Sequence, residues 1–155
     1  MNAYSLDNPI FQIYAVAASL AILKLIGHAF YTVYRMVRSD GGYLNPEDIR
    51  KTLFNPHPQA TQLQAYEDVE RARRMHRNEL ENTPAFLAAG LLLVAAQPSQ
   101  MFAMITMFGY LAARLAHSYA YATERDHEVR AACFTVGAVF TVAMVLYVLV
   151  SLLQR

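Results

Sequence analysis

Six polar residues between positions 70 and 81 have the types and the spacing to bind an anionic ligand: Glu70, Arg73, Arg74, Arg77, Asn78 and Glu81. At 100° per residue, they fall within one stripe of a helix. Arginine binds carboxylates through paired hydrogen bonds, an amide side chain binds amide groups, and a carboxylate binds an ammonium group. The stripe therefore suits a ligand that carries carboxylates, an amine and amide bonds.

A solvated helix is the alternative explanation of this stripe. In that case Glu70–Arg74 and Arg77–Glu81 would form ion pairs four residues apart, each contributing a few tenths of a kcal/mol. However, residues 67–86 contain no glycine and lead directly into the apolar run 85–96. One continuous helix is therefore expected to carry the charged stripe toward a membrane.

Membrane-spanning helices must position the stripe. The chain has 155 residues, of which 55% are hydrophobic and only 16% charged. A span needs about 20 largely apolar residues, and four blocks qualify: about 10–37, 68–96, 101–123 and 129–153. We predict an all-α protein, a single membrane domain over residues 1–155 folded as a four-helix bundle. The net charge of +1 argues against a nucleic-acid partner.

The distribution of basic residues predicts the orientation. Residues 1–8 contain no Lys or Arg, whereas residues 35–77 contain many. Basic loops stay in the cytoplasm, so the connection at about 39–66 is predicted to be cytoplasmic and both termini to lie on the opposite side. No basic segment and no convincing cleavage site accompany the first span, so it is expected to be retained rather than removed as a signal peptide.

The first span carries a polar face formed by Lys24, His28, Tyr31 and Arg35, which are spaced by four, three and four residues. Charged groups at membrane depth are costly, so this face is expected to point into a bundle or a polar cavity. In the alternative reading, Lys24 extends its charged end toward the headgroups and Arg35 marks the interface.

The third span carries a second stripe, and the fourth begins with a cation. Tyr110, Arg114, His117, Ser118 and Tyr121 share one face. Arg114 could form a structural ion pair with an acidic residue of the second helix, and Tyr121 could be an interfacial anchor. Arg130 lies in the first turns of the last span, where the helix dipole favours an anion.

The connection at 39–66 has weaker signals. Asn45-Pro46-Glu47-Asp48 has the order expected at a helix start. His57 lies between two prolines and is expected to be a loop residue, and Cys133 has no partner with metal-ligand spacing. No metal site is predicted.

The polar groups are expected to meet at the cytoplasmic ends of the four helices: Arg35, Arg73, Arg74, Arg77, Asn78, Glu81, His117, Tyr121 and Arg130. Glutathione has the matching inventory of two carboxylates, one amine and two peptide bonds. It also has a thiol, whose pKa a neighbouring cation lowers, so that more reactive thiolate forms. The spacing alone indicates only an anionic ligand at the membrane edge.

Three motifs identify a family resemblance. They are ERARRMHRNELEN at 70–82 followed by Pro84-Ala85-Phe86, NPED at 45–48, and RLAHSYAY at 114–121. In order and content they resemble the membrane-associated proteins in eicosanoid and glutathione metabolism (the MAPEG superfamily), most closely the branch of microsomal glutathione transferase and prostaglandin E synthase. The resemblance runs from Tyr34 to about Thr135, and the flanking parts match mainly in hydropathy. It implies a homotrimer of four-helix subunits with glutathione sites at the subunit interfaces.

The resemblance also implies roles for individual residues. The positions that match glutathione-contacting residues are Arg35, Arg73, Arg77, Asn78, Glu81, His117 and Tyr121. Arg130 matches the arginine proposed to hold the thiolate. We expect Asp48, which falls on the acidic residue of NPED, to be a supporting residue, together with Glu70, Arg74 and Arg114.

Two departures bear on the reaction. The prostaglandin E synthase has a Ser directly after the thiolate-binding arginine and a Tyr farther on, where this chain has Ala131 and Phe134. Segment 39–44 is also longer here than in the relatives, which affects the alignment of Arg35. The Arg-Ala pair resembles the glutathione transferase.

The resemblance therefore implies a membrane glutathione transferase active in detoxification. It would conjugate the thiolate to apolar electrophiles and could also reduce lipid hydroperoxides. Two alternatives stay open: a glutathione-dependent isomerase of lipid endoperoxides, and a non-catalytic trimer whose arginines bind lipid headgroups or a partner. The second substrate is not determined, because an apolar site accepts many molecules.

Overall fold

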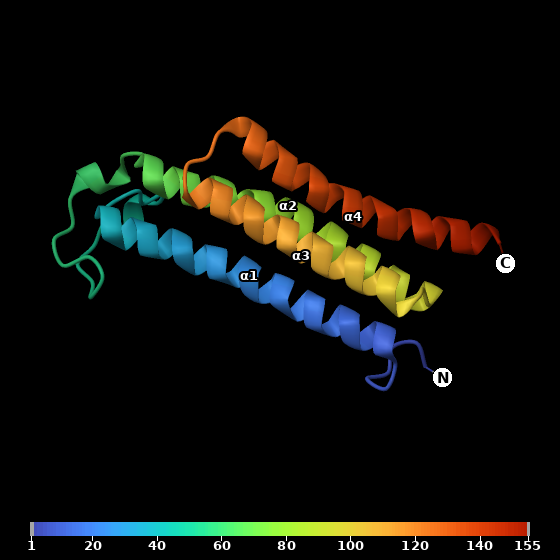
Figure 1. The fold of residues 1–155 in the computed structure, drawn as a ribbon. Helices are drawn as coiled ribbons and strands as arrows, with labels where there is room; N and C mark the ends of the chain where they lie inside the picture. Colours follow the sequence, from blue (N-terminus) through green and yellow to red (C-terminus); the bar gives the residue numbers. More distant parts are fainter. Residues whose placement is uncertain (1, 155) are drawn as a thin grey trace. The chain divides into compact units, whose positions relative to one another are not determined.

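The computed structural model describes residues 2–154, and its helices lie where the hydropathy pattern predicts them (Figure 1). The elements in chain order are α1 (Pro9–Ser39), η1 (Pro46–Asp48), η2 (Ala60–Leu63), α2 (Glu67–Ala96), α3 (Gln100–Ala122) and α4 (His127–Leu153). The bounds of the four long helices differ from the predicted ones by two residues or fewer. Residues 2–154 contain no strand, so the all-α prediction is confirmed.

Side-chain caps fix the starts of the last two helices. Ser99 accepts a hydrogen bond from the N–H of Phe102 at 3.3 Å, and Asp126 accepts one from the N–H of Val129 at 3.2 Å. Both caps satisfy backbone donors that the first turn of a helix leaves without partners. The predicted helix start at Asn45 is a single 3₁₀ turn, and Asn45 donates to Asp48 at 3.1 Å instead of capping the turn.

Three helical segments are long and apolar enough to cross a membrane: Pro9–Ser39, Ala60–Ala96 and His127–Leu153. Within residues 2–154, α3 does not reach the same hydropathy, and it carries the polar stripe of Arg114, His117 and Ser118. Three of the four predicted spans thus meet the criterion of length and composition. A membrane-spanning position of α3 stays a prediction.

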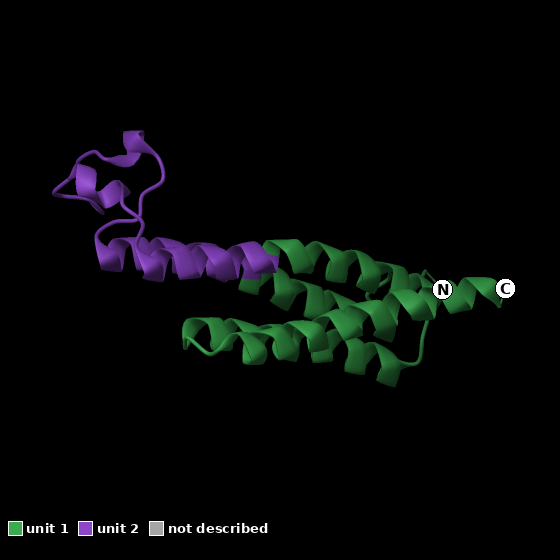
Figure 2. Ribbon diagram, turned by 90° about the horizontal axis from the view of Figure 1, so that it is seen from above, with its two compact units in different colours: residues 1–24, 80–155 green, residues 25–79 purple. Residues whose placement is uncertain are grey.

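The chain divides into two compact units, which Figure 2 shows in different colours. Residues 2–24 and 80–154 form one unit, called the bundle unit below. Leu25–Glu79 forms the other, called the loop unit because it contains the whole connection between α1 and α2. Helices α1 and α2 each contribute residues to both units.

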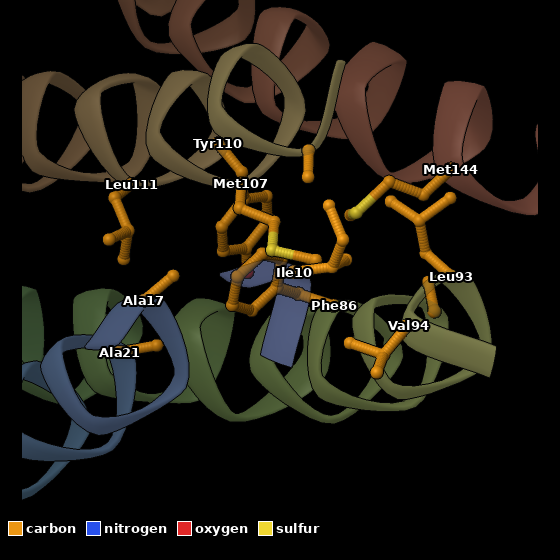
Figure 3. Packing of buried hydrophobic residues seen from close by; sticks show 12 residues of the cluster. Ile10, Ala17, Ala21, Phe86, Leu93, Val94, Met107, Tyr110, Leu111 and Met144 are labelled. Atoms are coloured by element: carbon orange, nitrogen blue, oxygen red, sulfur yellow. The ribbon is translucent and has the colours of Figure 1, made fainter. Parts of the chain in front are cut away.

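The bundle unit has a core to which all four long helices contribute (Figure 3). Phe86 of α2 is fully buried, and its ring lies parallel to that of Tyr110 of α3, with 4.0 Å between the ring centroids. The other buried members are Ile10, Ala17, Ala21, Ala89, Leu93, Val94, Ala103, Met107, Leu111 and Met144. Small residues on α1 face larger ones on α2 and α3, which allows the helices to pack closely. Within this unit the predicted four-helix packing is present.

Glycines permit two of these close approaches. A Cβ at Gly90 would lie 2.8 Å from the ring of Tyr14, and a Cβ at Gly109 would lie 2.5 Å from the ring of Phe140. Tyr14 also donates a hydrogen bond from its hydroxyl to the carbonyl of Leu87 at 3.1 Å. The Tyr14 hydroxyl, which lies within a span, is therefore satisfied by the backbone of α2.

Candidate functional site

The arginines of the loop unit are held by partners from the same unit. Arg35 of α1 forms an ion pair with Asp68 at the start of α2. Arg73 forms an ion pair with Glu70 and also donates to the backbone carbonyl of Gly42. A guanidinium has five N–H donors, so these contacts leave donors on Arg73 for a ligand carboxylate. Asp68 and Gly42 were not predicted to take part, because only the fold brings them to these arginines.

The ion pairs of Glu70 and Arg74 on α2 differ from the two pairs that the solvated-helix alternative would form. Glu70 pairs with Arg73, three residues away, and Arg74 pairs with Glu67, seven residues away, at 2.5 Å. The pairs Glu70–Arg74 and Arg77–Glu81 of the solvated-helix alternative therefore do not form. Several rotamers of a long side chain reach partners on one helix face, and spacing alone does not choose among them.

Two residues of the stripe, Arg77 and Glu81, are exposed on α2. Within residues 2–154 neither forms an ion pair or a side-chain hydrogen bond. Asn78 beside them is half-buried. A cation and an anion one helical turn apart, each without an intrachain counterion, are available for the carboxylate and the ammonium group of a zwitterionic ligand.

In the bundle unit, three predicted site residues come together where α3 ends and α4 begins. His117 is buried, and its ring meets the edge of the Tyr121 ring with 5.1 Å between centroids. Arg130 of α4 places its guanidinium carbon 4.9 Å from the centroid of the same Tyr121 ring. The ring of Phe134 lies 6.5 Å from that of His117. The positive charge of Arg130 is thus oriented by an aromatic face rather than by a carboxylate.

Such an arrangement suits a cation that must bind an anion. A carboxylate partner would neutralise Arg130, whereas an aromatic face orients the guanidinium and leaves its charge uncompensated. The N-terminal turns of α4 add the positive end of the helix dipole. A thiolate placed here would meet a fixed positive potential.

Arg114 has a different environment, because it is one of the largest fully buried side chains in the described chain. Gly137 of α4 lies opposite, and a Cβ at that position would come within 3.3 Å of Cδ of Arg114. The absence of a side chain at Gly137 therefore makes room for this arginine. A supporting role of Arg114 in the site stays a prediction.

Asp48 lies in η1 and lines a cavity of about 520 Å³ in the loop unit. The wall of this cavity is mostly apolar and aromatic, with Phe30, Tyr34, Tyr43 and Phe54 among its residues. No cysteine or histidine is among the residues that line the cavity. Within residues 2–154, no group of three or more His, Cys, Asp or Glu side chains could hold a metal ion.

Known proteins are similar to this chain over most of its length. The sequence model of the MAPEG family matches residues 14–150, beyond both ends of the segment in which the motifs lie. Microsomal glutathione S-transferase 1 of Homo sapiens is 33% identical over 144 residues, which cover 90% of this chain and 88% of that protein. The same protein of Rattus norvegicus is 31% identical over 140 residues, with the same coverage. Prostaglandin E synthase of Homo sapiens is 28% identical over 151 residues, which cover 96% of this chain and 95% of that protein.

The match of the family model spans most of the chain, and three helical segments are long and apolar enough to cross a membrane. The resemblance that the three motifs carry is thereby confirmed. The chain is an integral membrane protein that belongs to the MAPEG family.

Proposed function

We propose that this protein is a membrane-bound glutathione transferase that conjugates glutathione to apolar electrophiles. The observation that carries the proposal is Arg130, whose guanidinium lies over the ring of Tyr121 beside the buried His117 at the start of α4. Relatives named glutathione S-transferase match 90% of the chain, which supports the same ligand.

In this proposal the residues divide the work by charge. Arg130 stabilises the thiolate, and His117 and Tyr121 contact the ligand beside it. The carboxylates and amide groups of the tripeptide are bound by Arg35, Arg73, Arg77 and Asn78. Its ammonium group is bound by Glu81. The exposed and unpaired state of Arg77 and Glu81 supports their assignment. Glu70 and Arg74, which have partners on their own helix, act as supports.

The reaction needs only proximity and thiolate stabilisation. The thiolate sulfur forms a bond with the electrophilic carbon, and the leaving group departs with its bonding electrons. In a side activity the same thiolate reduces a lipid hydroperoxide to the alcohol and water, while two glutathione molecules are oxidised to the disulfide.

Glutathione should stabilise the purified protein. A ligand that binds only the folded state at a hundredfold excess over its Kd adds about 2.7 kcal/mol of stability. We therefore expect glutathione to raise the Tm, measured by thermal unfolding. We also expect turnover of a chloronitrobenzene in detergent, measured by the absorbance of the conjugate. The ethyl diester of glutathione, which lacks both carboxylates, is the matched control and should shift Tm far less.

Two rival functions predict other outcomes of this experiment. The similarity to prostaglandin E synthase favours an endoperoxide isomerase, although Ala131 and Phe134 depart from that enzyme. Isomerisation of a lipid endoperoxide without any conjugation would establish it in place of the transferase. A non-catalytic protein whose arginines bind lipid headgroups would show no shift with glutathione and a shift with anionic lipid.

We also propose a homotrimer, with the connection between α1 and α2 and the glutathione residues on the cytoplasmic side. Only 11% of the most apolar window of α4 is buried within the chain, which leaves its apolar surface for neighbouring subunits and lipid. Native mass spectrometry of the detergent-extracted protein should give the mass of three chains, and a monomer at all detergent concentrations would contradict the trimer. An impermeant thiol reagent should label a cysteine introduced at Thr61 only from the cytoplasmic side.

A further inference from the structure

One buried amide organises the connection between α1 and α2. The side chain of Gln62 is almost fully buried, with 2% of its surface exposed. Its Nε2 donates to Asp40 at 2.8 Å and to Asn55 at 3.0 Å. Its Oε1 accepts from the side chain of Asn55 at 2.8 Å and from the N–H of Gln59 at 3.1 Å. Both donors and both acceptor positions of this amide are therefore used.

The bonds of Gln62 join parts of the connection that lie far apart in sequence. Asp40 directly follows α1, Asn55 lies between the two 3₁₀ helices, and Gln59 precedes η2. Asn55 is itself 1% exposed, and it exchanges two hydrogen bonds with Gln62. Buried networks in which every group has a partner hold one conformation, because a broken bond leaves a buried polar group unsatisfied.

A single peptide group links Gln62 to Arg73. The N–H of Tyr43 donates to the backbone carbonyl of Gln62 at 2.9 Å. The carbonyl of Gly42, on the other side of the same peptide bond, accepts from the guanidinium of Arg73. A peptide group is planar and stiff, so a displacement of Gln62 that rotates this plane also moves the acceptor that orients Arg73.

Close packing keeps this peptide group against α2. Gly42 has a φ of +76°, and a Cβ there would lie 3.0 Å from the side chain of Val69. A Cβ on the preceding Gly41 would lie 2.4 Å from the ring of Tyr66. Both glycines are thus required by close approach, and Gly42 also by its left-handed backbone conformation. This packing restricts how the segment can move against Tyr66 and Val69.

We propose that Gln62 is a positioning residue for glutathione, acting on Arg73 through the Gly42–Tyr43 peptide group. The inference rests on the proposed function, in which Arg73 binds the tripeptide. Gln62 contacts residues of the connection and not Arg73 itself, so in this proposal it affects glutathione through the placement of Arg73. Substitution should therefore weaken glutathione binding and leave the chemical step nearly unchanged.

The test replaces Gln62 with leucine, which has a similar size and no hydrogen-bonding groups. Gln62→Leu should raise the KM for glutathione roughly tenfold, the size expected when one hydrogen bond to a charged group is lost. The kcat at saturating glutathione and the KM for the electrophile should stay within about twofold. Gln64→Leu is the matched control, because Gln64 is exposed and its side chain has no hydrogen bond within residues 2–154.

A double-mutant cycle separates this role from general support of the fold. In an Arg73→Ala background, Gln62→Leu should raise the glutathione KM by less than about twofold, because the residue it acts through is gone. Asn55→Ala removes only the amide pair and should give an intermediate effect. Folding of Gln62→Leu is checked by helical circular dichroism and gel filtration. If this variant does not fold, Asn55→Ala takes its place in the cycle with Arg73→Ala.

The outcomes distinguish the two proposals. The positioning role is overturned if the increases in glutathione KM caused by Gln62→Leu and Arg73→Ala multiply in the double mutant. It is also overturned if Gln62→Leu and Asn55→Ala both leave this KM as Gln64→Leu does. The proposed transferase function stands in both cases. If the wild-type protein neither binds nor turns over glutathione, the proposed function fails and this inference fails with it.

Discussion

Arg130→Ala is expected to lower kcat/KM for glutathione conjugation by about 10²–10³-fold, the usual loss when one group that stabilises a developing or bound anion is removed. In the structure, Arg130 lies over the Tyr121 ring and is not neutralised by an ion pair within residues 2–154. Its charge is therefore available to a thiolate. Without it, bound glutathione would stay largely in the thiol form.

The measurement combines steady-state turnover with the ultraviolet absorbance of the thiolate on addition of glutathione. Arg130→Ala should lose the thiolate signal, and Arg130→Lys should retain part of it, because an ammonium keeps the charge but lacks the planar group that stacks on Tyr121. Arg125→Ala is the matched control, since Arg125 is an exposed arginine in the turn before α4. Wild-type turnover in Arg130→Ala would sink the assignment of the thiolate to this residue.

Phe86→Ala is expected to reduce the free energy of unfolding by about 3 kcal/mol, within the range found for large-to-small changes in well-packed cores. Phe86 is fully buried and stacked parallel to Tyr110 (Figure 3). The lost stability comes mainly from the contacts of the ring and from the cavity left behind. In a membrane the lipid is as apolar as the side chain, so transfer from water contributes less than in a soluble protein.

Denaturation of the detergent-solubilised protein, followed by circular dichroism, measures this effect. Phe30→Ala is the control, because Phe30 is 70% exposed and loses few contacts on truncation. Phe86→Leu should fall between wild type and Phe86→Ala, since it keeps part of the packing. Equal stability of Phe86→Ala and Phe30→Ala would show that the stacked pair does not contribute as the structure indicates.

Hydropathy and turn residues were enough to predict the four helices. The neutral turn between α2 and α3 and the charged turn between α3 and α4 both lie where the apolar runs are interrupted. Helix bounds depend on local features of the sequence, namely apolar run length and capping residues such as Ser99 and Asp126. The family could also be recognised, because its motifs are contiguous in the sequence.

Contacts within the site were harder to predict. Periodicity correctly placed Glu70, Arg73 and Arg77 on one helix, but it did not indicate that Glu70 pairs with Arg73 or that Arg73 bonds to Gly42. A helical repeat fixes the direction in which a side chain leaves the backbone, whereas rotamers and chain reversals fix what it meets.

The sequence by itself determined the helices, the membrane class, the family and which residue types are available for an anionic ligand. Only the tertiary structure decided that Arg130 lies on Tyr121 and that Gln62 and Asn55 form a buried pair at the base of the connection. Nothing in the local spacing of these residues indicates the contact, because the partners lie on different elements or on opposite sides of a loop. Their distances depend on how the chain folds back on itself, which is the information that a one-dimensional pattern does not contain.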